Sequence, residues 1–169
     1  MKILLTLTDE EYPNSGFNHI REVVRALVLD ECGRVAIHYL ERDDKFGKID
    51  YYETPGGGVD EGETFVEAVK RECREEIGYE IEIVDEIGEV DDAYNLIGRQ
   101  NHNHYYLAKR TNFVGTHFVS KGDSYIKKTI WVDLDEAVTL YQSMPDKLVS
   151  KLVKNRELPI LLLAKELIK

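Results

Sequence analysis

The chain has 169 residues, enough to bury a hydrophobic core, and we expect residues 1–169 to form a single domain. Its composition, 43% hydrophobic and 32% charged, is ordinary for a globular protein. The net charge of -10 argues against a nucleic-acid polymer as the main partner, because neutralising phosphates requires a basic surface. A nucleotide is not excluded, because a bound cation can reverse the local charge.

Cysteine usage and hydropathy indicate the compartment. Cys32 and Cys73 are too few for a disulfide framework and lack metal-site spacing, which indicates reduced thiols in a cytoplasmic protein. The apolar start at residues 3–5 is too short for a signal peptide, and no apolar run reaches the length of a membrane span. The sequence therefore predicts no membrane partner, and it leaves homodimer formation open.

The first third of the chain is predicted to consist of strands and turns that lead to a glycine-rich loop. Strands are predicted at residues 3–8, 21–29, 34–40 and 49–53. Residues 10–19, rich in Pro, Asn and Gly, and the charged residues 41–48 are predicted to be loops. Gly56, Gly57 and Gly58 follow, where the missing side chains let the backbone approach a ligand or ion.

A short acidic helix is predicted directly after the glycines. Thr64 and Glu67 form a capping box at its start, and Gly78 is suited to end it in the left-handed conformation. The predicted apolar stripe comprises Phe65, Val66, Val69, Cys73 and Ile77.

The rest of the chain is predicted to alternate strands with loops and then to end in helices. Strands are predicted at residues 81–90, with a bend near Asp85, and at 102–108 and 129–132. Residues 91–101 and 109–128 are predicted to be loops, the second with an extended piece at 116–119. Helices are predicted at about 133–142, about 145–153, and from Pro159 at a first helical position. This order favours an α/β fold, a mixed sheet with helices on both faces.

The acidic helix gathers three carboxylates on one face. Glu72, Glu75 and Glu76 are three or four residues apart, so they repel one another by roughly 0.2–0.5 kcal/mol per pair. A hard divalent cation with oxygen ligands would compensate for this repulsion. The alternative is a solvated helix face, which is common in Glu-rich helices, but the adjacent glycines favour a binding site.

From Gly57 to Tyr79 the segment resembles the Nudix box, G-x5-E-x7-R-E-U-x-E-E-x-G-U, where U is a bulky aliphatic residue. Its fixed positions are filled by Gly57, Glu63, Arg71, Glu72, Glu75, Glu76 and Gly78. Cys73 and Tyr79 depart from the pattern at U positions, and neither departure affects the acidic residues. The box covers about a seventh of the chain.

The resemblance implies the Nudix α/β/α sandwich and metal-dependent hydrolysis of a nucleoside diphosphate linked to another group. Mg²⁺ or Mn²⁺ would be held by Glu72, Glu75, Glu76 and a carbonyl of the loop, assigned to Gly57. The same glutamates are the predicted catalytic residues, and one of them or an acidic residue of a later loop would act as general base. Glu63 and Arg71 are assigned mainly a structural role, as an ion pair that ties the loop to the helix.

The substrate is predicted as a small nucleotide or nucleotide derivative, nominally a nucleoside triphosphate with an oxidised purine. Arg25 and the glycines Gly56, Gly57 and Gly58 are the predicted substrate-binding residues. A different class of function, a ligand-sensing Nudix module without turnover, remains the alternative.

A second metal hypothesis concerns His102 and His104, which point to the same face of a predicted strand. With a carboxylate they could bind zinc, although such a pair is more often part of a polar sheet face.

Overall fold

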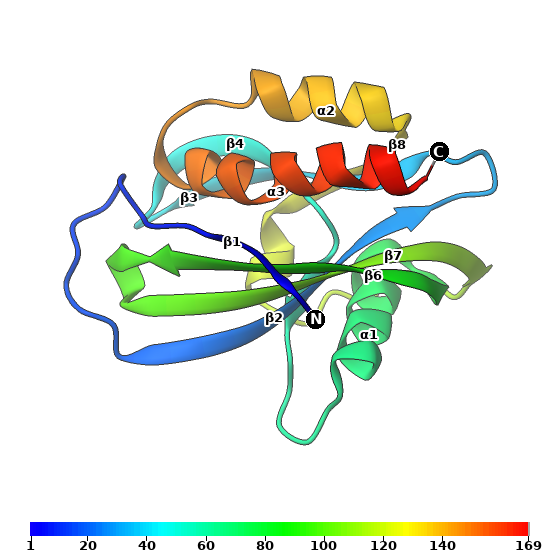
Figure 1. Ribbon diagram of the computed structural model, residues 1–169, viewed down its shortest axis with the longest axis horizontal. Coiled ribbons are helices and arrows are strands. Elements are labelled where there is room, and N and C mark those ends of the chain that lie inside the picture. The colour runs from blue at the N-terminus through cyan, green and yellow to red at the C-terminus, as the bar shows by residue number, and fades with distance from the viewer. Residues whose placement is uncertain (169) are drawn as a thin grey trace.

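The computed structural model describes residues 1–168, and its strands and helices form three layers (Figure 1). The strands are β1 (Ile3–Thr6), β2 (His19–Leu29), β3 (Val35–Asp44), β4 (Gly47–Glu53), β5 (Gly56–Gly58), β6 (Tyr79–Tyr94), β7 (Arg99–Phe113) and β8 (Ile126–Val132). The helices are α1 (Phe65–Ile77), α2 (Leu134–Ser143) and α3 (Leu148–Leu167), with short 3-10 helices η1 (Asn95–Ile97) and η2 (Gly122–Tyr125).

The strands form a mixed sheet in the order β1-β6-β7-β2-β3-β4, with β5 paired to β2 and β8 paired to β3. The pairs β1–β6 and β2–β7 are parallel, and the other pairs are antiparallel. Between β2 and β3 the register contains one pair, Leu29 with Val35, so the two halves of the sheet are joined by a narrow contact.

Helices cover both faces of the sheet, with α1 on one side and α2 and α3 on the other (Figure 1). Each side has its own hydrophobic core. Under α1, Val69 and Cys73 pack with Val24 and Tyr106 of the sheet. Under α2 and α3, Tyr141 and Leu161 belong to a larger core that includes Leu27. The predicted α/β fold with helices on both faces is confirmed.

The local signals of α1 are confirmed in detail. Thr64 is the N-cap, and the reciprocal hydrogen bonds of the capping box with Glu67 are both present. Gly78 closes the helix with φ 75° in the left-handed region. One stripe residue was predicted wrongly: Val66 is exposed rather than buried, and Ala68 lies in the core instead. The small alanine gives too weak a periodic signal to be distinguished on sequence alone.

Three predicted loops, at residues 41–48, 91–101 and 109–128, were wrong in part, because strands extend beyond their apolar residues. Residues 41–48 form most of a β-hairpin, in which β3 pairs with β4 from His38–Glu53 to Asp44–Gly47. Residues 91–101 contain the end of β6, η1 and the start of β7. Polar side chains on these strands face the functional pocket, so they carry no alternating apolar signal. The predicted bend near Asp85 is confirmed by register shifts on both sides of it.

The C-terminal half differs from the prediction at two further places. Residues 116–119 are not a strand; instead β7 extends to Phe113 and β8 begins at Ile126. The helices predicted at 145–153 and from Pro159 are one continuous helix, α3, with Pro159 inside it. Pro159 removes the hydrogen bond to the carbonyl of residue 155, four positions earlier. Asn155 is exposed, so water can satisfy that carbonyl. None of the helices within residues 1–168 has the length and apolar character needed to cross a bilayer.

Candidate active site

The glycine loop forms β5 and brings bare backbone against β2 and α1. Gly56 has φ 152°, and a Cβ there would overlap the carbonyl oxygen of Val24. A Cβ at Gly57 would lie 2.5 Å from Oε1 of Glu72. Side chains at these positions would therefore push apart the loop, the strand and the helix.

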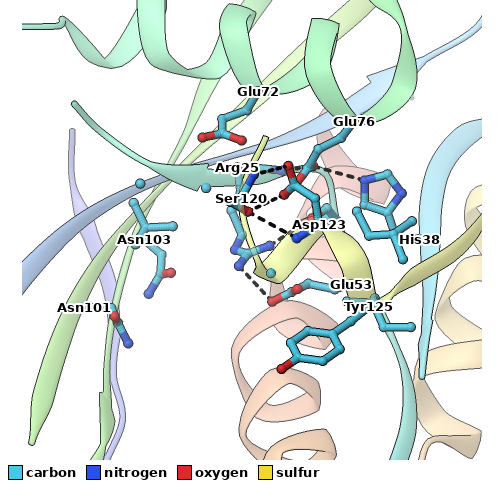
Figure 2. A pocket seen from close by; sticks show the side chains of 18 of the residues that line it. Arg25, His38, Glu53, Glu72, Glu76, Asn101, Asn103, Ser120, Asp123 and Tyr125 are labelled. Carbon is cyan, nitrogen blue, oxygen red and sulfur yellow. Dashed lines mark hydrogen bonds and ion pairs between the residues drawn. The ribbon is translucent and has the colours of Figure 1, made fainter. Parts of the chain in front are cut away.

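Three acidic side chains meet beside this loop, and we call them the carboxylate cluster: Glu72, Glu76 and Asp123. Glu72 and Glu76 project from α1, and Asp123 approaches from η2 on the other side of the pocket (Figure 2). One oxygen from each lies within 4.8 Å of the others, and all three residues are buried. The cluster therefore joins part of the sequence motif to a residue 47 positions further along the chain than Glu76.

Burial and mutual repulsion change the proton affinity of this cluster. Burial, reinforced by the charge of Glu76, raises the pKa of Glu72 to about 7. Burial also raises the pKa of Glu76, although hydrogen bonds from His38 and the Gly56 backbone N–H oppose it. Buried like charges without a compensating cation are unfavourable. Three hard oxygen donors next to exposed backbone fit a divalent cation such as Mg²⁺.

His38 and the backbone of Gly56 fix the position of Glu76. Nε2 of His38 lies 3.1 Å from Oε2 of Glu76, and the N–H of Gly56 donates to the same oxygen at 2.8 Å. Nδ1 of His38 lies 2.8 Å from the Thr129 hydroxyl, which fixes the ring orientation. The sequence shows no partner for His38, because Glu76 is 38 residues away on α1 and meets it only in the folded chain.

Asp123 is the functional candidate that sequence reasoning did not identify by number. Its carboxylate accepts hydrogen bonds from the backbone N–H groups of Val119 and Ser120 and from the Ser120 hydroxyl. These bonds give the polar segment before β8 a defined shape. The only available signal was general: an acidic residue in a later loop was considered as a base, without a position.

The predicted pair of Arg71 and Glu63 is present. The two guanidinium nitrogens Nε and Nη2 of Arg71 lie 2.8 and 2.9 Å from the Glu63 carboxylate oxygens, and Nη2 also donates to the Gly58 carbonyl at 2.9 Å. Arg71 thus links the loop to α1. Glu75, a predicted ligand, lies 3.5 Å from Arg71 and outside the carboxylate cluster, so its role at the metal stays a prediction.

Arg25 lines the pocket but also belongs to what we call the buried ion network: Arg25, Glu53, Asp92, Arg156 and Glu157. Arg25 donates to the Thr54 carbonyl at 2.9 Å and lies 2.7 Å from Glu53. Arg156 lies 2.7 Å from Glu53 and 3.1 Å from Asp92. Arg25 therefore has a structural role, and its role in binding the substrate stays a prediction.

Glu157 connects this network to the glycine loop. Its carboxylate accepts hydrogen bonds from the backbone N–H and the hydroxyl of Thr54, at 2.9 and 2.8 Å, and from Tyr141. Thr54 is two residues before Gly56, so these bonds tie the start of the glycine loop to α3, on the face of the sheet opposite α1.

The space enclosed by these groups is a cavity of about 240 Å³ between α1, β7 and η2. Arg21 and Arg99 line it near the glycine loop, and Nε of Arg99 is buried without a hydrogen-bond partner. Asn101 and Asn103 line it from β7, both donating through Nδ2 to Asp92. Arg42 covers the rings of Phe46 and Tyr125, with its Cζ 4.3 and 5.0 Å from their centroids. The cavity thus combines carboxylates, cations and aromatic groups.

The comparisons with known proteins agree with this fold. A family model described as "NUDIX domain" matches residues 19–152. The chain therefore belongs to the Nudix family. It is a Nudix hydrolase, and this supports pyrophosphohydrolase activity in general terms. No curated protein matches the chain.

Several solved structures are similar. A Nudix hydrolase from Nitrosomonas europaea has 15% identity and a TM-score of 0.61, over 82% of this chain and 88% of that one. A MutT Nudix hydrolase from Burkholderia pseudomallei has 25% identity and a TM-score of 0.56, over 82% and 98%. A MutT protein from Methanosarcina mazei Go1 has 18% identity and a TM-score of 0.58, over 86% and 96%.

Proposed function

We propose that this protein hydrolyses a nucleoside diphosphate linked to another group, by attack of water on phosphorus, with Mg²⁺ or Mn²⁺ held by the carboxylate cluster. The observation that carries the proposal is the meeting of Glu72, Glu76 and Asp123 at the glycine loop. The nominal substrate is a nucleoside triphosphate, with an oxidised purine as first choice.

The proposed ligands are Glu72, Glu76 and Asp123, with Glu75 and the carbonyl of Gly57 as the further ligands that the family motif implies. A divalent cation bound there would neutralise phosphate oxygens and lower the pKa of a bound water. The chain itself supplies orientation, because His38 and the Gly56 N–H hold Glu76 in one position. A carboxylate of the cluster, or another acidic residue of the site, takes the proton of the attacking water as general base.

The cations of the cavity suit the phosphate chain. Arg21 lies against Gly58, since a Cβ on that glycine would be 2.6 Å from Nη2 of Arg21. Burial and the nearby charge of Arg21 lower the pKa of Arg99. Two neighbouring guanidinium groups, one with an unpaired Nε, are complementary to the oxygens of a diphosphate. They explain how a chain with net charge -10 can attract an anionic substrate.

The amides of β7 favour a base that presents hydrogen-bond donors. Oδ1 of Asn101 is buried without a partner, while its Nδ2 donates to Asp92 at 2.7 Å. This fixed orientation offers the cavity an acceptor. An 8-oxopurine carries an N–H at the ring position where an ordinary purine carries the acceptor N7. An oxidised purine therefore matches Asn101 better than its parent does.

A nucleotide panel with Mg²⁺ tests the proposal. We expect phosphate or pyrophosphate release from at least one nucleoside diphosphate derivative, abolished by EDTA, with 8-oxo-dGTP preferred over dGTP. Asn101→Ala should reduce that preference and leave hydrolysis of dGTP nearly unchanged. Binding of nucleotides without release from any member of the panel would contradict the proposal and favour the ligand-sensing module.

A further inference from the structure

A second group of metal-binding residues lies on the face of the sheet that α1 covers, and it shares no residue with the carboxylate cluster. Glu89 and Asp91 of β6 and His102 of β7 each offer one ligand atom, and these atoms lie within 4.8 Å of one another. Asp91 is directly opposite His102 in the strand register, which holds the side chains together. All three residues are half-buried.

Glu22 orients the imidazole of His102. Nδ1 of His102 lies 3.0 Å from Oε1 of Glu22, on the neighbouring strand β2. When Nδ1 carries the hydrogen of this bond, the lone pair is on Nε2, the nitrogen that remains for a ligand. A carboxylate bound to the second nitrogen is the usual support of a metal-binding histidine, because it fixes the tautomer and the ring orientation.

Unpaired buried atoms at the same place are an independent observation that points to a ligand. His104 is 5% exposed; its Nε2 lies 2.6 Å from Glu22, and its Nδ1 has no hydrogen-bond partner. That Nδ1 lies 3.6 Å from Oε2 of Glu89, so it is directed at the group. Oδ1 of Asp91 is also buried without a partner. Such atoms are rare in folded proteins and usually indicate a missing water or ion.

We propose that Glu89, Asp91 and His102 form a second metal site, which binds Zn²⁺ or a similar divalent transition metal, with Glu22 as its supporting carboxylate. One imidazole and two carboxylates suit zinc and its neighbours, whereas Mg²⁺ prefers oxygen ligands alone. Phe65 of α1 stacks on His104 with ring centroids 4.0 Å apart, which holds the His104 ring in place next to Glu22 and Glu89. Thus His102 is the proposed ligand, and His104, whose Nδ1 faces Glu89, lies beside it under Phe65.

The electrostatics of the group agree with this assignment. Glu89 and Asp91 place two carboxylates in one half-buried space, where like charges repel one another. A cation would remove that repulsion. The site does not depend on the proposed nucleotide hydrolysis, because none of its residues lines the catalytic cavity.

Calorimetric titration with Zn²⁺ tests the site in the Glu76→Gln background, which weakens metal binding at the carboxylate cluster. We expect one equivalent of Zn²⁺ to bind. His102→Gln and Asp91→Asn, added singly, should weaken binding by more than 100-fold. Glu22→Gln should weaken it by about 10–100-fold, as for other supporting carboxylates. His117→Gln, at an exposed histidine away from the group, is the matched control and should change nothing.

Co²⁺ absorption spectra give a second measurement on the same proteins. Visible bands that disappear in His102→Gln but persist in His117→Gln would support the site. If His102→Gln does not fold, Asp91→Asn and Glu89→Gln take its place, because both keep the shape of the side chain. Absence of Zn²⁺ binding in the parent, or equal affinity in the Asp91→Asn and His117→Gln variants, would overturn the proposal.

Discussion

Two buried groups of charges lie on either side of the glycine loop, and they are organised in opposite ways. In the carboxylate cluster, three acidic side chains meet, and burial raises the pKa of Glu72 and Glu76 although Arg71 lies 2.7 Å from Glu72. In the buried ion network, Arg156 lies against acidic partners, and Arg25 and Arg156 lower the pKa of Glu53 in spite of its burial.

In the ion network, opposite charges stabilise the fold. In the carboxylate cluster, like charges repel one another and are suited to binding a cation. The ion network sets two guanidinium groups against three carboxylates, and it connects α3 to Thr54, two residues before Gly56. In the carboxylate cluster, the basic neighbours are His38 at Glu76 and Arg71 at Glu72, and neither is shared by all three carboxylates. Removing a charge should therefore destabilise the first group and relieve the second.

The largest expected effect is on turnover. Glu76→Gln should lower kcat for the nucleotide substrate by several orders of magnitude, because a lost ligand can cost several kcal/mol of transition-state stabilisation. The measurement is kcat with saturating Mg²⁺. Near wild-type turnover in this variant would refute the assigned mechanism.

Arg156→Met is the corresponding change in the ion network. Its guanidinium is 1% exposed and lies against Glu53, Asp92 and Glu157. Without it these carboxylates lose a shared partner, and we expect a loss of about 3–5 kcal/mol in the free energy of unfolding.

Lys151→Met is the control for that experiment. Lys151 is on the same helix, 3.5 Å from Glu11, and its side chain is 30% exposed. Such a surface pair should contribute about 1 kcal/mol or less. Denaturant unfolding of both variants measures the difference, and equal losses would contradict the distinction between the two groups.

The pH dependence of stability should reveal the carboxylate cluster in EDTA. The pKa of Glu72 is raised from an ordinary value of 4.5 to about 7, so the folded state binds this proton more tightly than the unfolded chain does. Stability should therefore fall as the pH rises from about 4.5 to about 7, by an amount on the order of 3 kcal/mol. Unfolding of wild type and Glu72→Gln across this range isolates the contribution, and parallel curves would count against it.

The smallest effect is expected at the ion pair between the loop and α1. Glu63→Ala should destabilise the fold by about 1–2 kcal/mol, because it removes two hydrogen bonds to the partly exposed Arg71. The metal ligands remain, so kcat should fall far less than in Glu76→Gln. A loss of kcat as large as that of Glu76→Gln would show that Glu63 acts at the metal.

Local signals account for the parts of the site that the sequence predicted. The capping box, Gly78 and the spacing of the glutamates lie within one helix, where neighbouring residues decide the geometry. The strands were predicted where their apolar residues alternate, and their polar ends were missed. Those ends include Arg99 and Asn101, which line the cavity, so the missing apolar signal coincides with the proposed site.

Long-range contacts account for what was missed. The pairing of β8 with β3 brings η2 and Asp123 to the strand that carries His38, and His38 in turn contacts Glu76 of α1. Arg156 and Glu157 lie in a helix whose internal Pro159 suggested two separate helices. In each case the partner is far away in the sequence, and no periodic pattern identifies it.

Thermal melts of wild type and Glu76→Gln across a Mg²⁺ titration test the central claim most directly, that the carboxylate cluster is strained without a cation and relieved by one. In EDTA the variant should melt no lower than wild type, because one repelling charge is gone. Added Mg²⁺ should raise the Tm of wild type with its occupancy and raise that of the variant much less. An equal rise in both proteins would contradict the account.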